Sequence, residues 1–573
     1  MRMKTTGSPL WPCHKMEIVA LVCLVACTGF LFATFWSTGP ITWDDNSNIF
    51  QNPYYHAGYW LPFWTEPYFG LYVPVTSTVW EMLFRVAGGE AWPFRVLNWA
   101  LHLINTIFVC LLLKALARKW NFKSNATVFL GAAVFALHPL QVQAVAWISG
   151  GRDLLAGFFA LATVLVYGRW RGGLGFLAAT ILFLLALLSK PNVVTLPLVL
   201  PLAALVLDRE HLATSFRRAI FWLVLALPVI YMNTSAQAAH LRSVDLWQRP
   251  IVMFDTFAFY LAKLILPYPL SANYGRTPEW LLAEESRWWG AGLLIAMLIP
   301  LGMWACRRDR RYLLGLGWFI LLLPVSGIVS FGYQMISTVA DHYNYTPMAV
   351  IAIVTMLKAH RSFRNREWVY GFGIGLMILL SALSWERSRV WRDDFAFFTD
   401  MAEQAPDAYS TAIGMSIVMC EQKKDYEAGV AWTEKALIAR PNDIMALANQ
   451  AFCFLHARNY FRVIDMEADL DRLDLEVMER TQPTAYSSLL ASIGTAMIET
   501  QQYEDGYQYL CEAYRVKPSE PNHARNLEIA TQLLRRQGLQ PSCDPSASPE
   551  EPASPPIQDP FDYMIPEEEF NEE

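Results

Sequence analysis

Two adjacent acidic residues are the first candidates for chemistry in this chain. Asp44 and Asp45 lie in the segment Thr-Trp-Asp-Asp-Asn at 42–46, directly after the first long apolar stretch at about 16–36. Carboxylates at the mouth of a membrane helix are costly to place and seldom needed for folding. One of them can act as general base toward an acceptor hydroxyl, while its neighbour helps to raise its pKa. The alternative is helix capping, because Asp followed by Asn-Ser is good capping chemistry.

Cationic residues recur at the predicted helix ends on the same side of the membrane. Arg152 and Asp153 open one apolar stretch, and Lys190 separates two others with almost no loop between them. Arg152 is a candidate to pair with an anionic lipid head group, and Lys190 is a candidate for an anion contact. The alternatives are a tight turn with a helix cap at 150–153 and a snorkelling side chain at Lys190.

Further polar side chains gather at the same predicted membrane face. They are His138, Gln143, Tyr274, Arg276, Asp341, His342, Tyr343 and Tyr345, and Trp43 precedes the acidic pair. Polar density of this kind at helix mouths is hard to attribute to packing, so we interpret these residues as lining or binding residues of one site. No Gly-rich phosphate loop or Walker lysine is present. A sugar donor, if there is one, is therefore expected to be carried by a lipid rather than by a nucleotide.

The elements that must position these residues are membrane helices. The chain has 573 residues, is 54% hydrophobic and 17% charged, and has a mean hydropathy of +0.25, which is too apolar for a soluble domain. Apolar segments near 20 residues recur, and they are helical because lipid offers an open backbone no hydrogen-bond partners. The predicted fold is all-α: a polytopic transmembrane helix bundle followed by a soluble tetratricopeptide-repeat solenoid. The net charge of −6 does not suggest nucleic acid.

Eleven spans are predicted. They lie near 16–36, 93–117, 125–147, 153–168, 173–189, 191–207, 219–233, 288–305, 312–330, 344–358 and 367–385. Alternate connections carry basic clusters, at 114–123, 169–171, 209–218, 307–311 and 358–366, which places them and the N-terminus in the cytoplasm. Segment 251–267 is predicted to be re-entrant or interfacial, because a full crossing would put the cluster at 306–311 outside.

Three regions follow from this topology. Residues 1–392 form the membrane domain, with a long aromatic outer loop at 37–92 that we expect to lie on the bilayer. Residues 393–540 form an extracytoplasmic repeat domain, since Tyr426 recurs 34 residues later as Tyr460 and a third unit follows. Residues 541–573 are predicted to form a disordered acidic tail. The sequence leaves open any disulfide among Cys420, Cys453, Cys511 and Cys543.

At these residues the chain resembles the membrane glycosyltransferases of the C-type fold, in particular the transmembrane tetratricopeptide-repeat O-mannosyltransferases and their bacterial relatives. The matching stretches are 43–45 with Asn-Pro at 52–53, 98–105, 135–139, 145–148 with 151–157, 188–190 and 340–343. Their order and spacing hold across roughly residues 40 to 350. The repeats then follow as they do in that family.

The resemblance implies transfer of a sugar, with inversion, from a polyprenyl-phosphate or dolichyl-phosphate donor to a hydroxyl on protein Ser/Thr or on a glycan, on the extracytoplasmic face. It implies a base at Asp44 or Asp45, without deciding between them. Lys190, Arg152 and His342 are the matching or nearest cations for the donor phosphate, with Arg276 as a weaker candidate. The lining residues are then Trp43, His138, Gln143, Asp153, Asp341, Tyr343 and Tyr345.

Two positions depart from the family pattern. Gln143 stands where relatives usually have Glu, and His342 stands where they have Arg. Loss of the carboxylate puts an acid–base or metal-binding role at Gln143 in doubt. Loss of a permanent cation makes phosphate binding at His342 pH-dependent. A divalent metal has no support in the sequence, because the outer loops lack a clear third carboxylate.

The prediction is therefore a multi-pass enzyme of the inner membrane with periplasmic repeats, or of the endoplasmic reticulum with lumenal repeats if the source is eukaryotic. The repeats are expected to recruit the acceptor protein or glycan. One alternative is a non-enzymatic scaffold for pili or envelope polysaccharide that acts through its repeats. Another is a lipid-linked sugar flippase or polymerase, which predicts a polar vestibule on the inner side as well.

Overall fold

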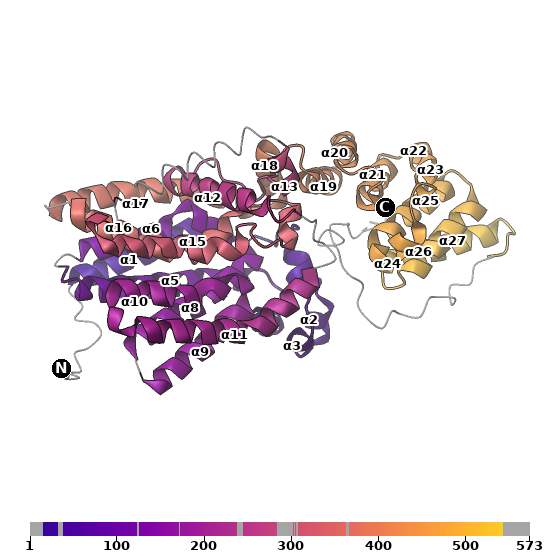
Figure 1. Cartoon of the computed structure of the whole chain (residues 1–573). Helices are drawn as coiled ribbons and strands as arrows, with labels where there is room; N and C mark the ends of the chain where they lie inside the picture. Colours follow the sequence, from indigo (N-terminus) through magenta and orange to yellow (C-terminus); the bar gives the residue numbers. More distant parts are fainter. Residues whose placement is uncertain are drawn as a thin grey trace.

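The computed structural model describes residues 15–32, 38–122, 125–170, 172–237, 244–283, 302, 304, 307–362 and 366–541. Helices make up its regular structure, and the described residues hold a single isolated β-bridge, between Tyr68 and Leu71. The all-α prediction is confirmed. Figure 1 shows the apolar helices gathered in one bundle, with the helices from α20 onward in a separate stack beyond it.

The bundle is built from long helices and several shorter ones. They are α1 (Lys15–Phe32), α5 (Trp92–Lys119), α6 (Ala126–Leu137), α7 (Val142–Ala146), α8 (Gly151–Arg169), α9 (Gly173–Ser189), α10 (Leu196–Leu207), α11 (Leu212–Gln237), α12 (Arg249–Ile265), α13 (Pro278–Leu282), α15 (Leu316–Leu322), α16 (Met348–Ser362) and α17 (Arg366–Ser388). Three helical stretches in the described part are long and apolar enough to cross a membrane, at 92–119, 148–169 and 212–237. The protein is thus a multi-pass membrane protein.

Two predicted spans differ from straight helices. The span at 125–147 bends by 48° between α6 and the segment from Pro139 to Ala146. Pro139 has no N–H and forces His138 into an extended conformation, which ends α6. The span at 312–330 becomes a series of short helices that ends at Val325, because Pro324 interrupts it. The span predicted at 288–305 lies almost entirely outside the described residues.

The long outer loop folds into short helices, and all but the first of them begin at a proline. They are η2 (Asn46–Phe50), α2 (Pro53–Ala57), α3 (Pro62–Thr65) and α4 (Pro74–Ala87). Proline suits the first helical turn because its missing N–H has no partner there in any case. Buried Tyr55 and Phe63 pack together, while Trp60 and Trp64 remain exposed. The loop therefore has a small core of its own and an aromatic outer surface.

The repeat region begins at α18. Its helices are α18 (Asp394–Gln404), α19 (Tyr409–Ile417), η13 (Val418–Gln422), α20 (Tyr426–Ala439), α21 (Ile444–His456), α22 (Tyr460–Asp465), α23 (Glu467–Leu470), α24 (Leu475–Thr481), α25 (Pro483–Glu499), α26 (Tyr503–Val516) and α27 (Pro521–Arg536). Successive helices of this region lie next to one another in a stack, as helical repeats require (Figure 1). The middle unit is irregular, because three short helices replace one long helix after Asn459.

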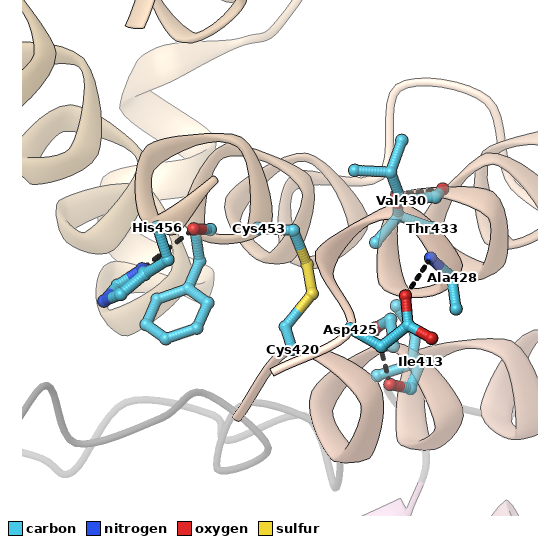
Figure 2. Close-up of a disulfide and its surroundings, with 10 residues drawn as sticks. Ile413, Cys420, Asp425, Ala428, Val430, Thr433, Cys453 and His456 are labelled. Atoms are coloured by element: carbon cyan, nitrogen blue, oxygen red, sulfur yellow. Dashed lines mark hydrogen bonds between the residues drawn. A yellow bond between two sulfur atoms is a disulfide. The ribbon is translucent and has the colours of Figure 1, made fainter. Parts of the chain in front are cut away.

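A disulfide links two successive repeats. Cys420 of η13 and Cys453 of α21 are bonded, and they lie 33 residues apart, close to one repeat period (Figure 2). Gly429 makes room for the bond, because a Cβ at this position would lie 2.0 Å from the Cys420 sulfur. Cys511 is also disulfide-bonded. Disulfides persist in oxidising compartments, so the bond favours an extracytoplasmic position for the repeats.

Removal of this cross-link is expected to destabilise the repeats. The double variant C420S/C453S should lower the free energy of unfolding of the repeat region by about 2–4 kcal/mol, since the bond closes a loop of intermediate length. Thermal unfolding monitored by circular dichroism measures the change. Addition of reductant should lower the stability of the native chain by more than that of the variant, in which the disulfide of Cys511 is still reduced but the Cys420–Cys453 bond is already absent. Equal stability of the two oxidised proteins contradicts this role.

Candidate active site

The two adjacent aspartates have different environments. Asp45 is fully buried, and its Oδ1 accepts hydrogen bonds from the backbone N–H of Ser149 at 2.9 Å and from the Ser149 hydroxyl at 2.7 Å. Its Oδ2 accepts from the backbone N–H of Ile41 at 3.2 Å. Oδ1 of Asp45 therefore holds the outer loop against the turn that precedes α8, and Oδ2 fixes the backbone of the loop itself, which is a structural role.

Asp44 keeps one carboxylate oxygen without a partner. Its Oδ2 accepts from the Asn48 amide at 3.0 Å and from Arg152 Nη2 at 3.3 Å. Its Oδ1 is buried and accepts no hydrogen bond, although the Trp147 indole is close enough to favour the charged form. The side chain is 15% exposed. Oδ1 is thus an acceptor held in place with no group bound to it, as a general base requires.

The electrostatics suit that role. Burial raises the pKa of Asp44 from its ordinary value to about 7, the nearby Arg152 guanidinium opposes the rise and Asp45 adds to it. A carboxyl with a pKa near neutrality can both take and release a proton at the working pH. Asp44 rather than Asp45 is therefore the candidate base.

Arg152 lies at the start of α8 beside this carboxylate. Its Nε donates to the backbone carbonyl of Ser149 at 3.1 Å, and its guanidinium lies 5.7 Å from the Trp80 ring and 5.6 Å from the Trp147 ring. Two indoles at these distances hold the guanidinium through cation–π attraction. The bond to Asp44 is long, so Arg152 can also face an anion that arrives beside it.

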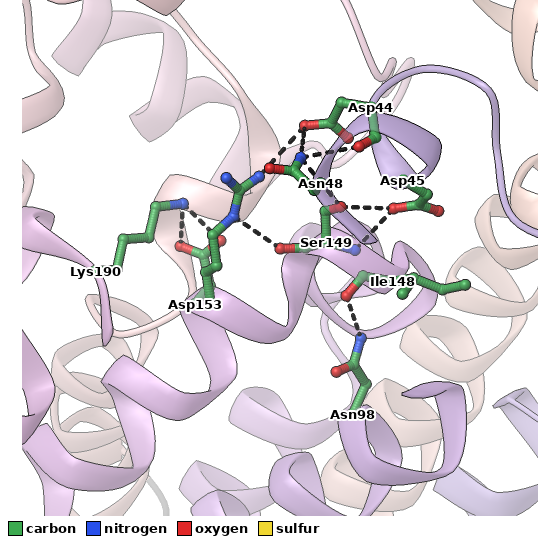
Figure 3. A network of polar contacts seen from close by, with 9 residues as sticks. Asp44, Asp45, Asn48, Asn98, Ile148, Ser149, Asp153 and Lys190 are labelled. Carbon is green, nitrogen blue, oxygen red and sulfur yellow. Dashed lines mark hydrogen bonds and ion pairs between the residues drawn. The ribbon is translucent and has the colours of Figure 1, made fainter. Parts of the chain in front are cut away.

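Lys190 forms a buried ion pair across the α8–α9 hairpin. Its Nζ donates to both oxygens of Asp153, at 2.8 and 2.7 Å, and the two side chains are 13% and 2% exposed. The ammonium also lies 5.3 Å from the centre of the Tyr343 ring. Figure 3 shows this pair next to the Asp44 network. Lys190 also lies close enough to the Asp44 carboxylate to interact with it electrostatically, so it is the second cation near Asp44.

The two positions that depart from the family pattern contact each other. The Gln143 side-chain oxygen accepts from the backbone N–H of His342 at 2.9 Å. The His342 ring lies 5.3 Å from Trp147 and 4.3 Å from Tyr343, and its Nδ1 is buried without a hydrogen-bond partner. This hydrogen bond places Gln143 and His342 side by side next to Trp147 and Tyr343.

The remaining predicted residues fall outside this group. Arg276 pairs with Asp255 at 2.5 Å, and Asp341 accepts from the Tyr274 hydroxyl at 2.7 Å. His138 caps the turn at Pro139. Tyr345 is bonded to His102 and Asn105 at 3.0 Å inside the bundle, where it packs helices together. The structure thus gives Tyr345 and His138 contacts that stabilise the fold.

The structure adds site residues that the sequence did not single out. Asn48 and Ser149 bond to the acidic pair, and Trp80 and Trp147 flank Arg152. The buried amide of Asn98 donates to the carbonyls of Trp147 and Ile148 at 2.9 and 3.2 Å and fixes that turn (Figure 3). The sequence did contain a signal for two of these residues, because Asn98 and Trp147 lie in the stretches on which the family resemblance rests. Among the described residues no three His, Cys, Asp or Glu side chains cluster as metal ligands.

Comparison with curated proteins gives a consistent result. Over 397 residues the chain is 22% identical to a protein O-mannosyl-transferase of Caenorhabditis elegans, which covers 64% of this chain and 55% of that protein. Over 299 residues it is 27% identical to the protein O-mannosyl-transferase Tmtc2 of Drosophila melanogaster, which covers 46% and 31%. The chain resembles the TMTC protein O-mannosyl-transferases.

A third relative extends the same pattern. The protein O-mannosyl-transferase TMTC1 of Homo sapiens is 32% identical over 98 residues, which cover 17% of this chain and 11% of that protein. The chain thus spans about half of the length of the Caenorhabditis elegans relative and less of the other two. No protein-family model matches the chain, and no solved structure matches it. The resemblance expected from the sequence motifs is confirmed.

Proposed function

We propose that this protein transfers a sugar, by analogy with its relatives a mannose, from a polyprenyl-phosphate-linked donor to a hydroxyl acceptor on the extracytoplasmic face. The observation that carries the proposal is the unpartnered Oδ1 of Asp44 beside Arg152 and Lys190. Asp44 can take a proton while Arg152 and Lys190 face a phosphate. Sugar transfer from a lipid phosphate needs this combination.

The reaction follows from these positions. Asp44 Oδ1 accepts the proton of the acceptor hydroxyl. At the same time the oxygen of that hydroxyl bonds to the anomeric carbon of the sugar, from the face opposite the phosphate. The bond between that carbon and the phosphate oxygen breaks, and the electron pair leaves with the lipid phosphate. The products are the inverted glycoside, the lipid phosphate and protonated Asp44. Arg152 and Lys190 stabilise the charge that grows on the leaving phosphate, so no proton donor is needed.

Two observations support the sidedness of this reaction. Basic clusters between the predicted spans favour a cytoplasmic position for those loops. The disulfide between Cys420 and Cys453 favours an oxidising compartment for the repeats. Asp44 follows the first span and lies on the side of the repeats in this topology. The repeats are then placed to recruit the acceptor protein or glycan.

The pH dependence of transfer tests the proposal. The base acts when ionised, so kcat/KM is expected to rise about tenfold per pH unit below a pKa near 7 and to level off above it. Initial rates from pH 5 to 9 with purified protein give the profile. Asn48→Asp places a second carboxylate against Asp44 and should move the rising limb to higher pH. A limb at the same pH in both proteins means that another group titrates.

A further inference from the structure

The first helix of the repeat region contacts the segment that carries Asp44. The Oδ1 atom of Asp394, the first residue of α18, accepts a hydrogen bond at 2.9 Å from the backbone N–H of Thr42. Thr42 lies two residues before Asp44 in the chain and 352 residues before Asp394. Asp394 is only 8% exposed. A partly buried hydrogen bond to a carboxylate is stronger than a typical hydrogen bond between neutral groups.

Aromatic packing reinforces this contact. The Trp43 ring lies 5.9 Å from the Phe397 ring and 6.2 Å from the Phe398 ring, and both phenylalanines are fully buried in α18. On the other side α19 presses against Phe398, since a Cβ at Gly414 would lie 1.8 Å from that ring. Trp43 therefore packs against a helix that is itself held by the repeats.

The second oxygen of Asp394 faces the repeats. Its Oδ2 accepts from the side-chain amide of Gln422 at 3.0 Å, and Gln422 ends η13, the helix that contains disulfide-bonded Cys420. One carboxylate thus connects the repeat stack to the segment 42–45. Figure 1 shows α18 in the corresponding place, between the bundle and the stack.

We propose that Asp394 is a positioning residue for Asp44, through which the repeat region holds the catalytic segment in the geometry that transfer requires. The effect on rate rests on the function proposed above, whereas the structural effect on the segment does not. Misplacement of a reacting group by about 1 Å can cost about 100-fold in rate. Loss of the Asp394 contact is therefore expected to act on kcat, with donor KM almost unchanged.

The test compares two neighbouring aspartates of α18. Asp394→Ala removes the contact with Thr42 and is expected to lower kcat by about 10- to 100-fold with donor KM within about twofold. Asp393→Ala is the matched control, because Asp393 caps the same helix through the backbone N–H of Ala396 at 2.8 Å and is not bonded to Thr42. It should lower the melting temperature and keep kcat. Equal kcat losses in the two variants overturn the proposal.

An isosteric variant separates position from charge. In Asp394→Asn the side-chain oxygen still accepts from Thr42, and the Gln422 amide can rotate to accept from the new amide nitrogen. This variant is expected to retain kcat within about threefold, since both hydrogen bonds survive. If Asp394→Asn is as slow as Asp394→Ala, the charge of Asp394 matters rather than its contact, and the positioning role is wrong.

Hydrogen exchange gives a readout that does not depend on activity. In Asp394→Ala the amides of the segment 41–48 should exchange at least about tenfold faster than in the native chain and in Asp393→Ala. Native exchange rates overturn the proposal, and so does faster exchange accompanied by native kcat. If Asp44→Asn proves fully active, the proposed base is wrong, while the exchange measurement still decides whether Asp394 holds the segment.

Discussion

Asp44→Asn is expected to lower the rate of sugar transfer by about 10²- to 10⁴-fold, the usual contribution of a positioned general base. Donor KM should change little, because the amide still fits beside Asn48 and Arg152 and the cations that face the donor phosphate remain. Initial rates of purified protein at several donor concentrations separate the two constants. The acid limb of the pH profile should vanish in this variant together with the rate.

Asp45→Asn is the matched control for this variant. Asparagine can still accept both hydrogen bonds from Ser149, but its amide nitrogen then faces the backbone N–H of Ile41. The expected result is a lower melting temperature, with kcat far less reduced than in Asp44→Asn. If both variants are well expressed and fully active, the base assignment fails, and the non-enzymatic scaffold becomes the better description.

Lys190→Met is expected to affect both folding and transfer. It leaves Asp153 buried without its partner, which costs about 3–5 kcal/mol of stability when one half of a buried ion pair is removed. It also removes one of the two cations assigned to the donor phosphate, so transfer should fall well below the native rate. Thermal unfolding in detergent and initial rates measure the two effects.

A double variant separates the effect of Lys190 on folding from its effect on transfer. K190M/D153L replaces the whole pair by apolar groups of similar size, which is often neutral or stabilising. Stability should return to near the native value while transfer stays low, because the phosphate still lacks its cation. Recovery of transfer along with stability would show that Lys190 serves only the fold.

The acidic pair shows how far sequence reasoning reaches. Adjacency and location marked Asp44 and Asp45 as candidates, but both interpretations, general base and helix cap, stayed open for each. The turn at 42–45 sends the two carboxylates in different directions, one to Ser149 and one to Arg152. That choice depends on contacts with residues about 100 positions away, which periodicity and composition do not encode.

The same limit applies to partners across helices. Lys190 and Asp153 were both singled out, yet their pairing depends on how α8 packs against α9. Tyr343 and Tyr345 are two residues apart, and the intervening short turn sends one toward Lys190 and the other to His102. Helical content and the repeat period were predictable, because apolar segment length and a recurring pattern are local properties.

The positions of the breaks in the membrane helices could be predicted from the sequence, but not their form. Pro139 and Pro324 stand inside predicted spans, and proline disturbs a helix interior. Whether it bends the helix or ends it depends on the packing around it. The span at 125–147 continues after a 48° bend, whereas the helix before Pro324 does not resume.

A reconstituted system shows which kind of sugar donor the protein uses. Purified protein in liposomes, with a labelled polyprenyl-phosphate mannose in the membrane and a Ser/Thr-containing acceptor on the repeat side, should transfer label to the acceptor hydroxyl. A nucleotide-linked mannose supplied in place of the lipid should give no transfer. Label transferred from the nucleotide sugar contradicts the proposed reaction. So does the absence of transfer from each of several lipid-linked sugars when the native protein is folded.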